Sequence, residues 1–551
     1  MSSDSLLVGP VLRYVDETTA TVWVETRAAG VVQVKTSGGS GLARTFAVHG
    51  HHYALVDIEG LAPGSTYDYN VEIDGELAWP PSESAFPASR INTLDGHRQL
   101  RMLFGSCRMS VPHDRQSNAS HGVDAMRAYA LALAGGEVAQ WPDLMLFLGD
   151  QVYADEPPES MEKFIAARRD ITAPPKGELK DYAEYAHLYE LSWSDPGNRW
   201  LLSTVPSAMI FDDHDIRDDW NTSAQWRREM AATPWWHDRI VGGLGSYWIY
   251  QHLGNLSPAD RAKDEMWKQV QAARATDESG DLGELIDAFA ERADEQPDSY
   301  RWSYTRDIGR NRLIVVDSRC ARVLKPDHRS IMDDAEVAWF DELLKGGFDH
   351  VIIGTSLPFL LSHGLHHLEA WNEAVATGAW GKRAAVAGEK LRRAIDLEHW
   401  AAFHEGFRKI AQMVLELASG ERGQAPGTVT FLSGDVHHSY VSEAVGKRQS
   451  RIVQAVCSPI RNPLPRSVRM AMTVLAGGFA TPLTSALARL AKVPRIPFEW
   501  TKVRGPWFDN NIATLETQGR GLSMRWEAGE VQGGREDAPV LKTVARVEIN
   551  G

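Results

Sequence analysis

Short apolar runs that each stop at a cluster of polar, metal-capable residues recur through the middle of this chain. Examples are LRMLFGSC (100–107), DLMLFLGD (143–150), SAMIFDDHD (207–215) and TVTFLSGD (428–435). Helical stretches with apolar residues three and four positions apart lie between such runs, as in EHWAAFHEGFRKIAQMVLELASG (398–420). Buried strands alternating with helices predict a layered α/β domain.

The first part of the chain has a different pattern. Short runs rich in Val, Tyr and Trp, such as TATVWVET (19–26), are separated by Gly, Ser and Asp and predict a β-sandwich over residues 1–95. LAPGSTYDYNVEID (61–74) resembles the late strands of fibronectin type III domains, with Tyr67 and Tyr69 placed as in a tyrosine corner. We expect an accessory module here, with a dedicated ligand-binding role as the alternative.

The second domain is predicted to run over residues 100–551. Long, Trp-rich and largely helical insertions are expected at about 156–206 and 222–300, and helices and strands at about 465–551. The last segments, NNIATLETQGRGLSMRWEA and VLKTVARVEING, alternate apolar and polar residues and predict edge strands of the same domain.

Composition excludes some partners and compartments. The chain has 551 residues and a net charge of −15, with no run of Lys or Arg that could follow a phosphate backbone, so a stable nucleic-acid partner is not expected. Its three cysteines are far apart, which argues against a disulfide framework. The N-terminus has no basic segment followed by an apolar core, which predicts a cytoplasmic protein, or an exported one if a signal peptide has been removed.

No segment reaches the length of a membrane span. VRMAMTVLAGGFATPLTSALARLAKV (468–493) comes nearest but is interrupted by Gly477, Gly478 and Pro482. We expect amphipathic helices packed on the body of the protein, with a membrane-surface segment as the alternative.

The polar residues at four strand ends predict a joint site. Since the carboxyl ends of parallel strands lie at one edge of a sheet, the side chains that follow them should converge. The donors are Cys107; Asp150 and Tyr153; Asp212 to Asp215; and Asp435 and His437. A single acidic turn is commonplace, but four such ends favour one site. Its mixture of carboxylate, imidazole, thiolate and phenolate suits a two-metal hydrolytic centre rather than a structural zinc site, and phosphoryl transfer is the reaction that most needs such a centre.

The motifs GSC, GDQVY, DDHD and SGDVHHS together resemble the PhoD-like alkaline phosphatases, a branch of the calcineurin-like metallophosphoesterases. The resemblance spans roughly residues 100–460 and extends to the N-terminal module and the Trp-rich insertion. It implies a four-layer α/β/β/α core and hydrolysis of phosphate monoesters or diesters.

The same resemblance implies a binuclear or larger metal cluster. Ferric iron would be bound by Cys107, Asp150, Tyr153 and His437. Asp150 would bridge to calcium or another divalent cation, which would meet Asp435 and carboxylates of the DDHDIRDD segment, for which Asp213 and Asp219 are the candidates. The superfamily's Asn before the conserved His is replaced by Asp213, and its extra His after the fourth strand is absent from GTSLPF; an all-oxygen second site of this kind favours calcium over zinc.

The predicted mechanism is attack on phosphorus by a hydroxide held between the metals, with His214 as the general acid for the leaving group. Arg108 and His438 are weaker candidates for contacting substrate; a surface salt bridge is an equal interpretation of Arg108.

Two alternatives remain. One is a phospholipase D-like enzyme or other phosphodiesterase that uses the same metals. Another is a non-catalytic metal-binding protein on this fold. Cysteine-based phosphatases, serine hydrolases and P-loop nucleotidases are disfavoured because their motifs are absent. A small phosphate ester is therefore the expected substrate, and oligomeric state is not predicted.

Overall fold

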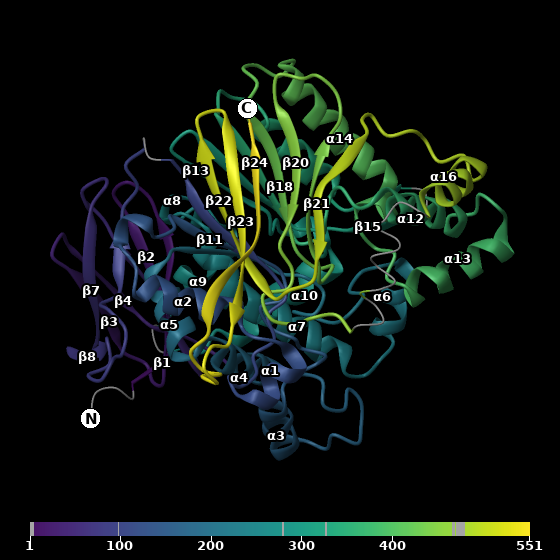
Figure 1. The fold of residues 1–551 in the computed structure, drawn as a ribbon. Helices are drawn as coiled ribbons and strands as arrows, with labels where there is room; N and C mark the ends of the chain where they lie inside the picture. The colour runs from purple at the N-terminus through teal and green to yellow at the C-terminus, as the bar shows by residue number, and fades with distance from the viewer. Residues whose placement is uncertain are drawn as a thin grey trace.

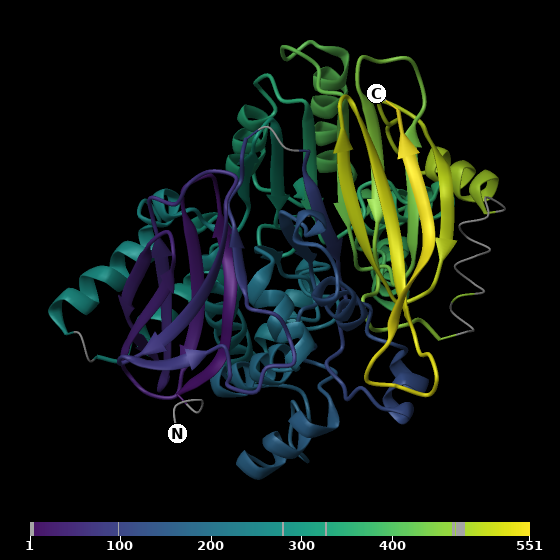
Figure 2. The same ribbon diagram turned by 60° about the vertical axis from the view of Figure 1, so that its left-hand side comes forward.

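Two β-sheets packed face to face form the centre of the molecule (Figures 1 and 2). The computed structural model describes residues 5–96, 99–277, 280–325, 328–465, 469 and 480–550. The first sheet has the order β12-β11-β10-β22-β23-β24 and the second β13-β14-β17-β18-β20-β19-β21. Their facing sides share one apolar core, with Phe104 and Leu146 from the first sheet against Leu313, Ile352 and Leu432 from the second.

The strands of the first sheet are β10 (Arg101–Gly105), β11 (Leu144–Leu148), β12 (Ser207–Ile210), β22 (Asn511–Gln518), β23 (Gly521–Glu530) and β24 (Val540–Ile549). Those of the second are β13 (Tyr304–Ile308), β14 (Asn311–Val316), β17 (His350–Thr355), β18 (Thr428–Ser433), β19 (Ser439–Ala444), β20 (Arg451–Val456) and β21 (Trp500–Trp507). β10, β11 and β12 pair in parallel, as do β14, β17, β18 and β20, so each sheet collects several carboxyl ends at one edge.

The expectation that the C-terminal segments are edge strands is wrong for β22 and β23. β22 pairs with β10 and β23, and β23 pairs with β22 and β24, so of these three strands only β24 lies at an edge of the first sheet. The alternating pattern is explained by the packing, because β22 and β23 bury Leu515, Met524 and Trp526 against the second sheet.

Helices cover the outer faces of both sheets. The first sheet is covered by α2 (Ala125–Ala134), α4 (Tyr182–Trp193), α5 (Pro196–Thr204) and α7 (Trp236–Tyr247). The second sheet is covered by α11 (Asp334–Leu343) and α14 (His404–Ser419), which bury Phe340, Phe407 and Ile410 against Ile314 and Phe431. The remaining helices between residues 156 and 300 are α3 (Glu159–Arg168), α6 (Ala224–Ala231), α8 (Pro258–Arg261), α9 (Glu265–Thr276) and α10 (Gly283–Glu295).

The N-terminal residues form two antiparallel sheets around a core of their own. One has the order β1-β2-β6-β5 and the other β4-β3-β7-β8, with β9 paired to β7. Their bounds are β1 (Leu6–Val15), β2 (Ala20–Thr26), β3 (Val31–Thr36), β4 (Ser40–Arg44), β5 (Phe46–Val48), β6 (His51–Ile58), β7 (Thr66–Ile73), β8 (Glu76–Trp79) and β9 (Arg90–Asn92). The hydroxyl of Tyr67 accepts a hydrogen bond from the backbone N–H of Ala62 at 2.9 Å, the contact of a tyrosine corner. The likeness to fibronectin type III domains stays a prediction.

The N-terminal sheets pack directly on the helical insertion. Trp23 lies 5.2 Å from the ring of Tyr250, and the buried guanidinium of Arg13 donates to the carbonyl oxygens of Tyr250 and Gln251 at 2.7 and 2.6 Å. These contacts bury the most aromatic part of the insertion, so its Trp residues belong to a core.

A smaller lobe projects beside the second sheet. It consists of α12 (His363–Ala376), α13 (Lys382–Ala394) and α16 (Thr481–Leu490), with α13 and α16 both packed on α12 (Figure 1). α16 covers part of the segment 468–493; residues 468 and 470–479 of that segment lie outside the described part of the chain. Among the described residues, no helix is long and apolar enough to cross a membrane.

Candidate metal centre

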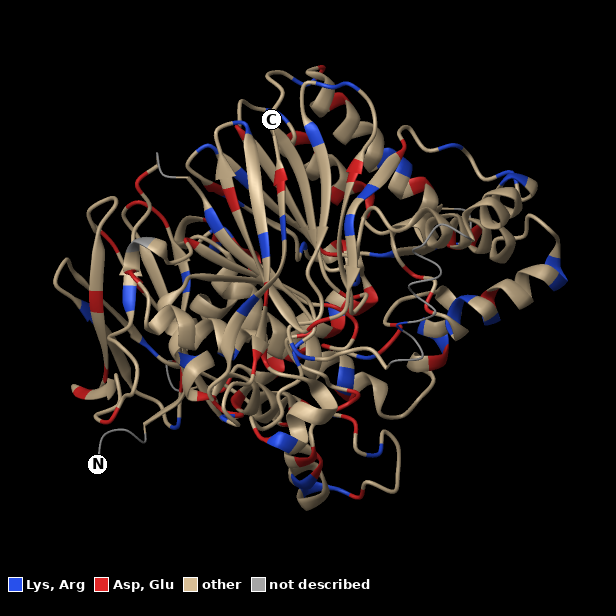
Figure 3. Cartoon of the chain, in the orientation of Figure 1, with Lys and Arg blue, Asp and Glu red and all other residues tan. Residues whose placement is uncertain are grey.

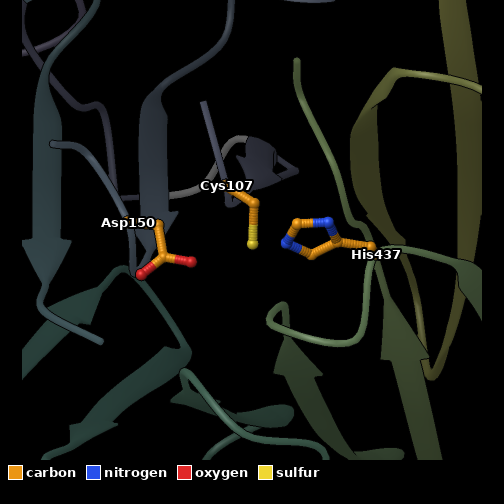
Figure 4. A group of neighbouring side chains, drawn as sticks. All are labelled: Cys107, Asp150 and His437. Carbon is orange, nitrogen blue, oxygen red and sulfur yellow. The ribbon is translucent and has the colours of Figure 1, made fainter. Parts of the chain in front are cut away.

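Three side chains from three different strand ends meet between the sheets. Cys107 follows β10, Asp150 follows β11 and His437 follows β18, and one ligand atom of each lies within 4.8 Å of the others (Figure 4). The two sheets approach closely here: a Cβ on Gly434 would lie 2.0 Å from the hydroxyl oxygen of Ser106, so only glycine fits at that position. The close approach brings donors from opposite sheets into one group.

The backbone at these positions is held in a conformation that L-residues rarely adopt. Cys107, Asp150, Asp435 and His437 have φ angles of 58°, 51°, 64° and 50°. Hydrogen bonds keep the backbone there: the N–H of Asp150 donates to Asp215 at 2.9 Å, and the N–H of His437 donates to the hydroxyl of Ser458 at 3.1 Å. Residues that surrounding contacts hold in the left-handed backbone region cluster at functional sites, because this conformation sets the direction of the side chain.

Burial shifts the pKa of each of the three donors, and one carboxylate oxygen among them has no hydrogen-bond partner within the described chain. Burial, together with Asp150, raises the pKa of the Cys107 thiol, and burial raises the pKa of Asp150, whose Oδ1 has no hydrogen-bond partner among the described residues. Burial lowers the pKa of His437 to about 4, so its imidazole is neutral and able to act as a ligand. A thiolate, a carboxylate and a neutral imidazole with an orphaned oxygen fit a metal cation, which would favour their deprotonated forms.

Tyr153 lies beside this group. Its hydroxyl is 3.4 Å from Oδ2 of Asp150, and its side chain packs with Cys107 in the same small buried cluster. Burial raises the pKa of Tyr153, with Cys107 and Asp150 adding to the effect. The fourth donor predicted for the first cation therefore lies next to two of the other three.

A second group of oxygens adjoins the first. Asp150, Asp212 and Asp213 each place a carboxylate oxygen within 4.8 Å of the others, and all three are buried. Oδ2 of Asp212 and Oδ1 of Asp219 have no hydrogen-bond partner within the described part of the chain. The set fits a hard cation that prefers oxygen ligands.

Arg319, which the sequence analysis missed, occupies the middle of these acids. Its buried guanidinium donates to Asp212 through Nε, and Nη2 lies 3.1 Å from Asp213 and 3.4 Å from Asp435. Nη1 lies 2.6 Å from Glu398. Arg319 follows β14 just as the predicted donors follow their strands, so the same rule would have found it had it been applied to cations.

Both carboxylate oxygens of Asp435 contact other side chains of the protein. Oδ1 contacts Arg319, and Oδ2 lies 2.9 Å from Nε2 of His399, whose Nδ1 is 2.7 Å from Glu369. Burial opposes ionisation, but the hydrogen bond from His399 and its charge hold the pKa of Asp435 well below its ordinary value. Asp435 is not in either group of metal-capable donors around Asp150, and its role as a ligand stays a prediction.

Glu398 and His399 carried no signal in the sequence. They lie in the short segment between α13 and η5 (Trp400–Phe403), which follows no strand. Only the packing of the lobe beside the second sheet brings them to the site.

His214 is anchored at the edge of the second group. Nδ1 lies 2.9 and 3.1 Å from the two oxygens of Asp155, and the ring lies 4.7 Å from that of Tyr153. Burial acts to lower the pKa of His214, but the carboxylates of Asp155 and Asp213 outweigh it and raise the pKa well above its ordinary value. These carboxylates favour the protonated imidazole. Nε2 makes no bond to Asp155 and lies 4.0 Å from an oxygen of Asp218.

The weaker candidates lie farther from the donors. Arg108 is buried, and its guanidinium bonds to Asp124 at 2.8 Å and to the carbonyl oxygen of Ser192 at 3.0 Å. The interpretation as a surface salt bridge is wrong in this respect, because the pair is buried; a contact with substrate stays a prediction. His438 bonds to the carbonyl oxygen of Val436 at 2.7 Å and stacks on Tyr440, and its predicted contact with substrate is likewise untested.

The fold resembles that of a solved structure. A solved structure described as "Structure of PhoD" superposes with a TM-score of 0.60 at 12% identity, covering 100% of this chain and 91% of that one. A purple acid phosphatase, PPD1 from yellow lupin (Lupinus luteus) seeds, matches at a TM-score of 0.48 and 9% identity, covering 98% of this chain and 74% of that one. At these identities the likeness to PhoD concerns the fold. No curated protein matches the chain.

Two family models match the sequence. A domain of unknown function, DUF7800, matches residues 3–91. The PhoD-like phosphatase model matches residues 117–474, a range that contains Asp150, Tyr153, the 212–219 acids, Asp435 and His437 and begins after Cys107. Because this match spans more than half of the chain, the protein belongs to the PhoD-like phosphatase family.

Proposed function

We propose that the chain is a metal-dependent phosphoesterase that hydrolyses small phosphate monoesters, with diesters as a second class to be tested. The observation that carries the proposal is the convergence of Cys107, Asp150 and His437 from three strand ends, with ligand atoms within 4.8 Å of one another. A buried carboxylate oxygen without a hydrogen-bond partner, such as Oδ1 of Asp150 among the described residues, is unfavourable for a protein that uses it only as structure.

The two donor groups would hold different cations. Cys107, Asp150, Tyr153 and His437 would hold the first, and two anionic donors beyond the carboxylate support ferric iron. Asp150, Asp212 and Asp213 would hold the second, with Asp219 nearby, and their oxygens support calcium. When bound, such cations stabilise the charge that develops on the phosphoryl oxygens and activate water for attack on phosphorus.

His214 is proposed as the general acid. Asp155 fixes its ring through Nδ1 and, with Asp213, keeps the imidazole protonated. Nε2 can then donate its proton to the ester oxygen as the bond to phosphorus breaks, so that an alcohol rather than an alkoxide leaves. Asp155 is a positioning residue in this scheme, because it acts through His214.

The proposal predicts activity that depends on bound metal. Purified protein should hydrolyse a small phosphate monoester, lose the activity on prolonged chelation, and regain it when iron and calcium are returned. The measurements are turnover and metal content on the same samples, with a diester assayed in parallel. Undiminished turnover after both metals have been removed would rule out the proposal.

Loss of His214 should depend on the leaving group. His214→Ala is expected to lower kcat about 100-fold or more for an alkyl phosphate, whose alkoxide needs a proton, and much less for a nitrophenyl phosphate. The measurement is kcat for both esters in wild type and variant. His187→Ala is the control, because His187 pairs with Glu190 away from the site; equal losses for both esters in His214→Ala would contradict the role of general acid.

A further inference from the structure

α16 leaves two large apolar side chains exposed to water although it packs on α12. The residues that it buries are small: Thr484 and Ala488 face the body of the protein, where α16 packs on α12. Leu483 and Leu490, seven positions apart and so on one face, are 66% and 69% exposed. The expectation that this segment packs on the body holds for α16, but Leu483 and Leu490 stay exposed.

α13, which also packs on α12, presents a similar face. Val386 is 61% exposed, and Arg383 and Lys390, three positions before it and four after it, share its face. Trp380, just before the helix, is 43% exposed and rests with its edge on Trp371. Large apolar side chains thus stand beside cations on both helices.

The charge of this lobe is opposite to that of the whole protein. The chain carries −15, yet α13 contains five basic residues and one acid, and residues 481–495 contain three basic residues and no acid. Arg392 and Arg393 pair with Glu389 and Glu229. Within the described chain, Lys382, Arg383 and Lys390 have no carboxylate partner. Figure 3 shows Lys and Arg positions in blue along α13 and beside α16.

We propose that this surface docks on an anionic membrane. It consists of the exposed side chains of α13, α16 and the residues next to them: Trp380, Lys382, Arg383, Val386, Lys390, Leu483, Leu490 and Lys492. Aliphatic side chains flanked by cations match the boundary between acyl chains and anionic headgroups. A nucleic acid would use the cations but offers no apolar layer for the leucines, so charge and apolarity together favour a bilayer.

The docking surface is connected to the metal centre by a short segment of the chain. α13 ends at Ala394, and His399, which bonds to Asp435 in the site, follows five residues later. Five extended residues span at most roughly 18 Å, so the end of α13 cannot lie farther than that from His399. This inference goes beyond the proposed function and does not depend on it.

The test is binding of the whole protein to sedimentable vesicles. Vesicles of phosphatidylcholine and phosphatidylglycerol, mixed at about 2:1, should bind the protein, and pure phosphatidylcholine should bind it at least about tenfold more weakly. Raising the salt concentration should weaken the binding. Two double variants, L483S/L490S and K382E/R383E, are each expected to reduce binding to the anionic vesicles about tenfold or more.

Leu42→Ser is the matched control, because Leu42 is 62% exposed on β4, far along the chain from the lobe; it should bind like wild type. Thermal unfolding midpoints verify that each variant is folded, without reference to activity. The proposal is overturned if the wild-type protein does not bind anionic vesicles, or if the folded double variants bind them as wild type does. It is also overturned if the free wild-type protein is a dimer and the double substitutions make it dissociate. In the last case the surface would be covered by a second copy of the chain.

Discussion

Replacing Asp150 with Asn is expected to lower kcat/KM for phosphate esters by about a thousandfold or more and to deplete both metals. Asp150 is the one carboxylate shared by the Cys107–His437 group and the Asp212–Asp213 group. The amide keeps the shape of the side chain but removes the charge that both cations would need. Metal content and turnover of wild type and variant are the measurements, and Asp349→Asn, at an exposed pair with Arg310, is the control.

The same substitution should have the opposite effect on stability without metal. Burial raises the pKa of Asp150 in the folded protein. The folded state is therefore destabilised at pH values above the pKa that Asp150 has in the unfolded chain, and this cost disappears as the pH falls below that pKa. In chelator at pH 7, Asp150→Asn should therefore unfold at a higher urea concentration than wild type. A variant that keeps its metals and its activity would show that Asp150 is not the bridging ligand.

Replacing Arg319 with Met should destabilise the protein by about 3–5 kcal/mol. Arg319 is completely buried and contacts four carboxylates, from Asp212, Asp213, Glu398 and Asp435. Met fills similar volume but leaves these acids facing one another without a cation. The measurement is the urea unfolding midpoint in chelator, followed by the midpoint with calcium added, which should restore part of the loss.

Arg310→Met is the comparison for that experiment. Arg310 also contacts a carboxylate, with 2.8 Å between Nε and Asp349, but the pair is exposed and should contribute no more than about 1 kcal/mol. Similar losses for the two variants would mean that Arg319 does not hold the acids of the site together.

The predicted donors were found by a rule of position rather than by residue type. Cys107, Asp150 and His437 each follow an apolar strand, and parallel pairing in both sheets carries those strand ends to one place. The same rule holds for a cationic side chain, which was not among the predicted residues. Arg319 follows β14 in the same way, and it neutralises acids that are 107 and 116 residues away in the chain.

The position of β22 in its sheet and the exposure of two leucines on α16 could not be predicted from the local sequence. β22 has the alternating pattern of an edge strand, and only its pairing with β10, about 400 positions earlier, puts it inside a sheet. α16 has the composition of a helix that buries its leucines, but Thr484 and Ala488 are its buried residues, and Leu483 and Leu490 are exposed.

The sequence by itself determined the α/β character of the chain, the donor types and the class of chemistry, because these depend on hydrophobic periodicity and on which side chains follow each strand. Only the tertiary structure decided the electrostatic state of each donor. Asp150 keeps an unpartnered oxygen, whereas Asp435 is held by Arg319 and His399. The physical reason is that ion pairing and desolvation depend on distances of a few ångströms between segments far apart in the chain, and these distances exist only after folding.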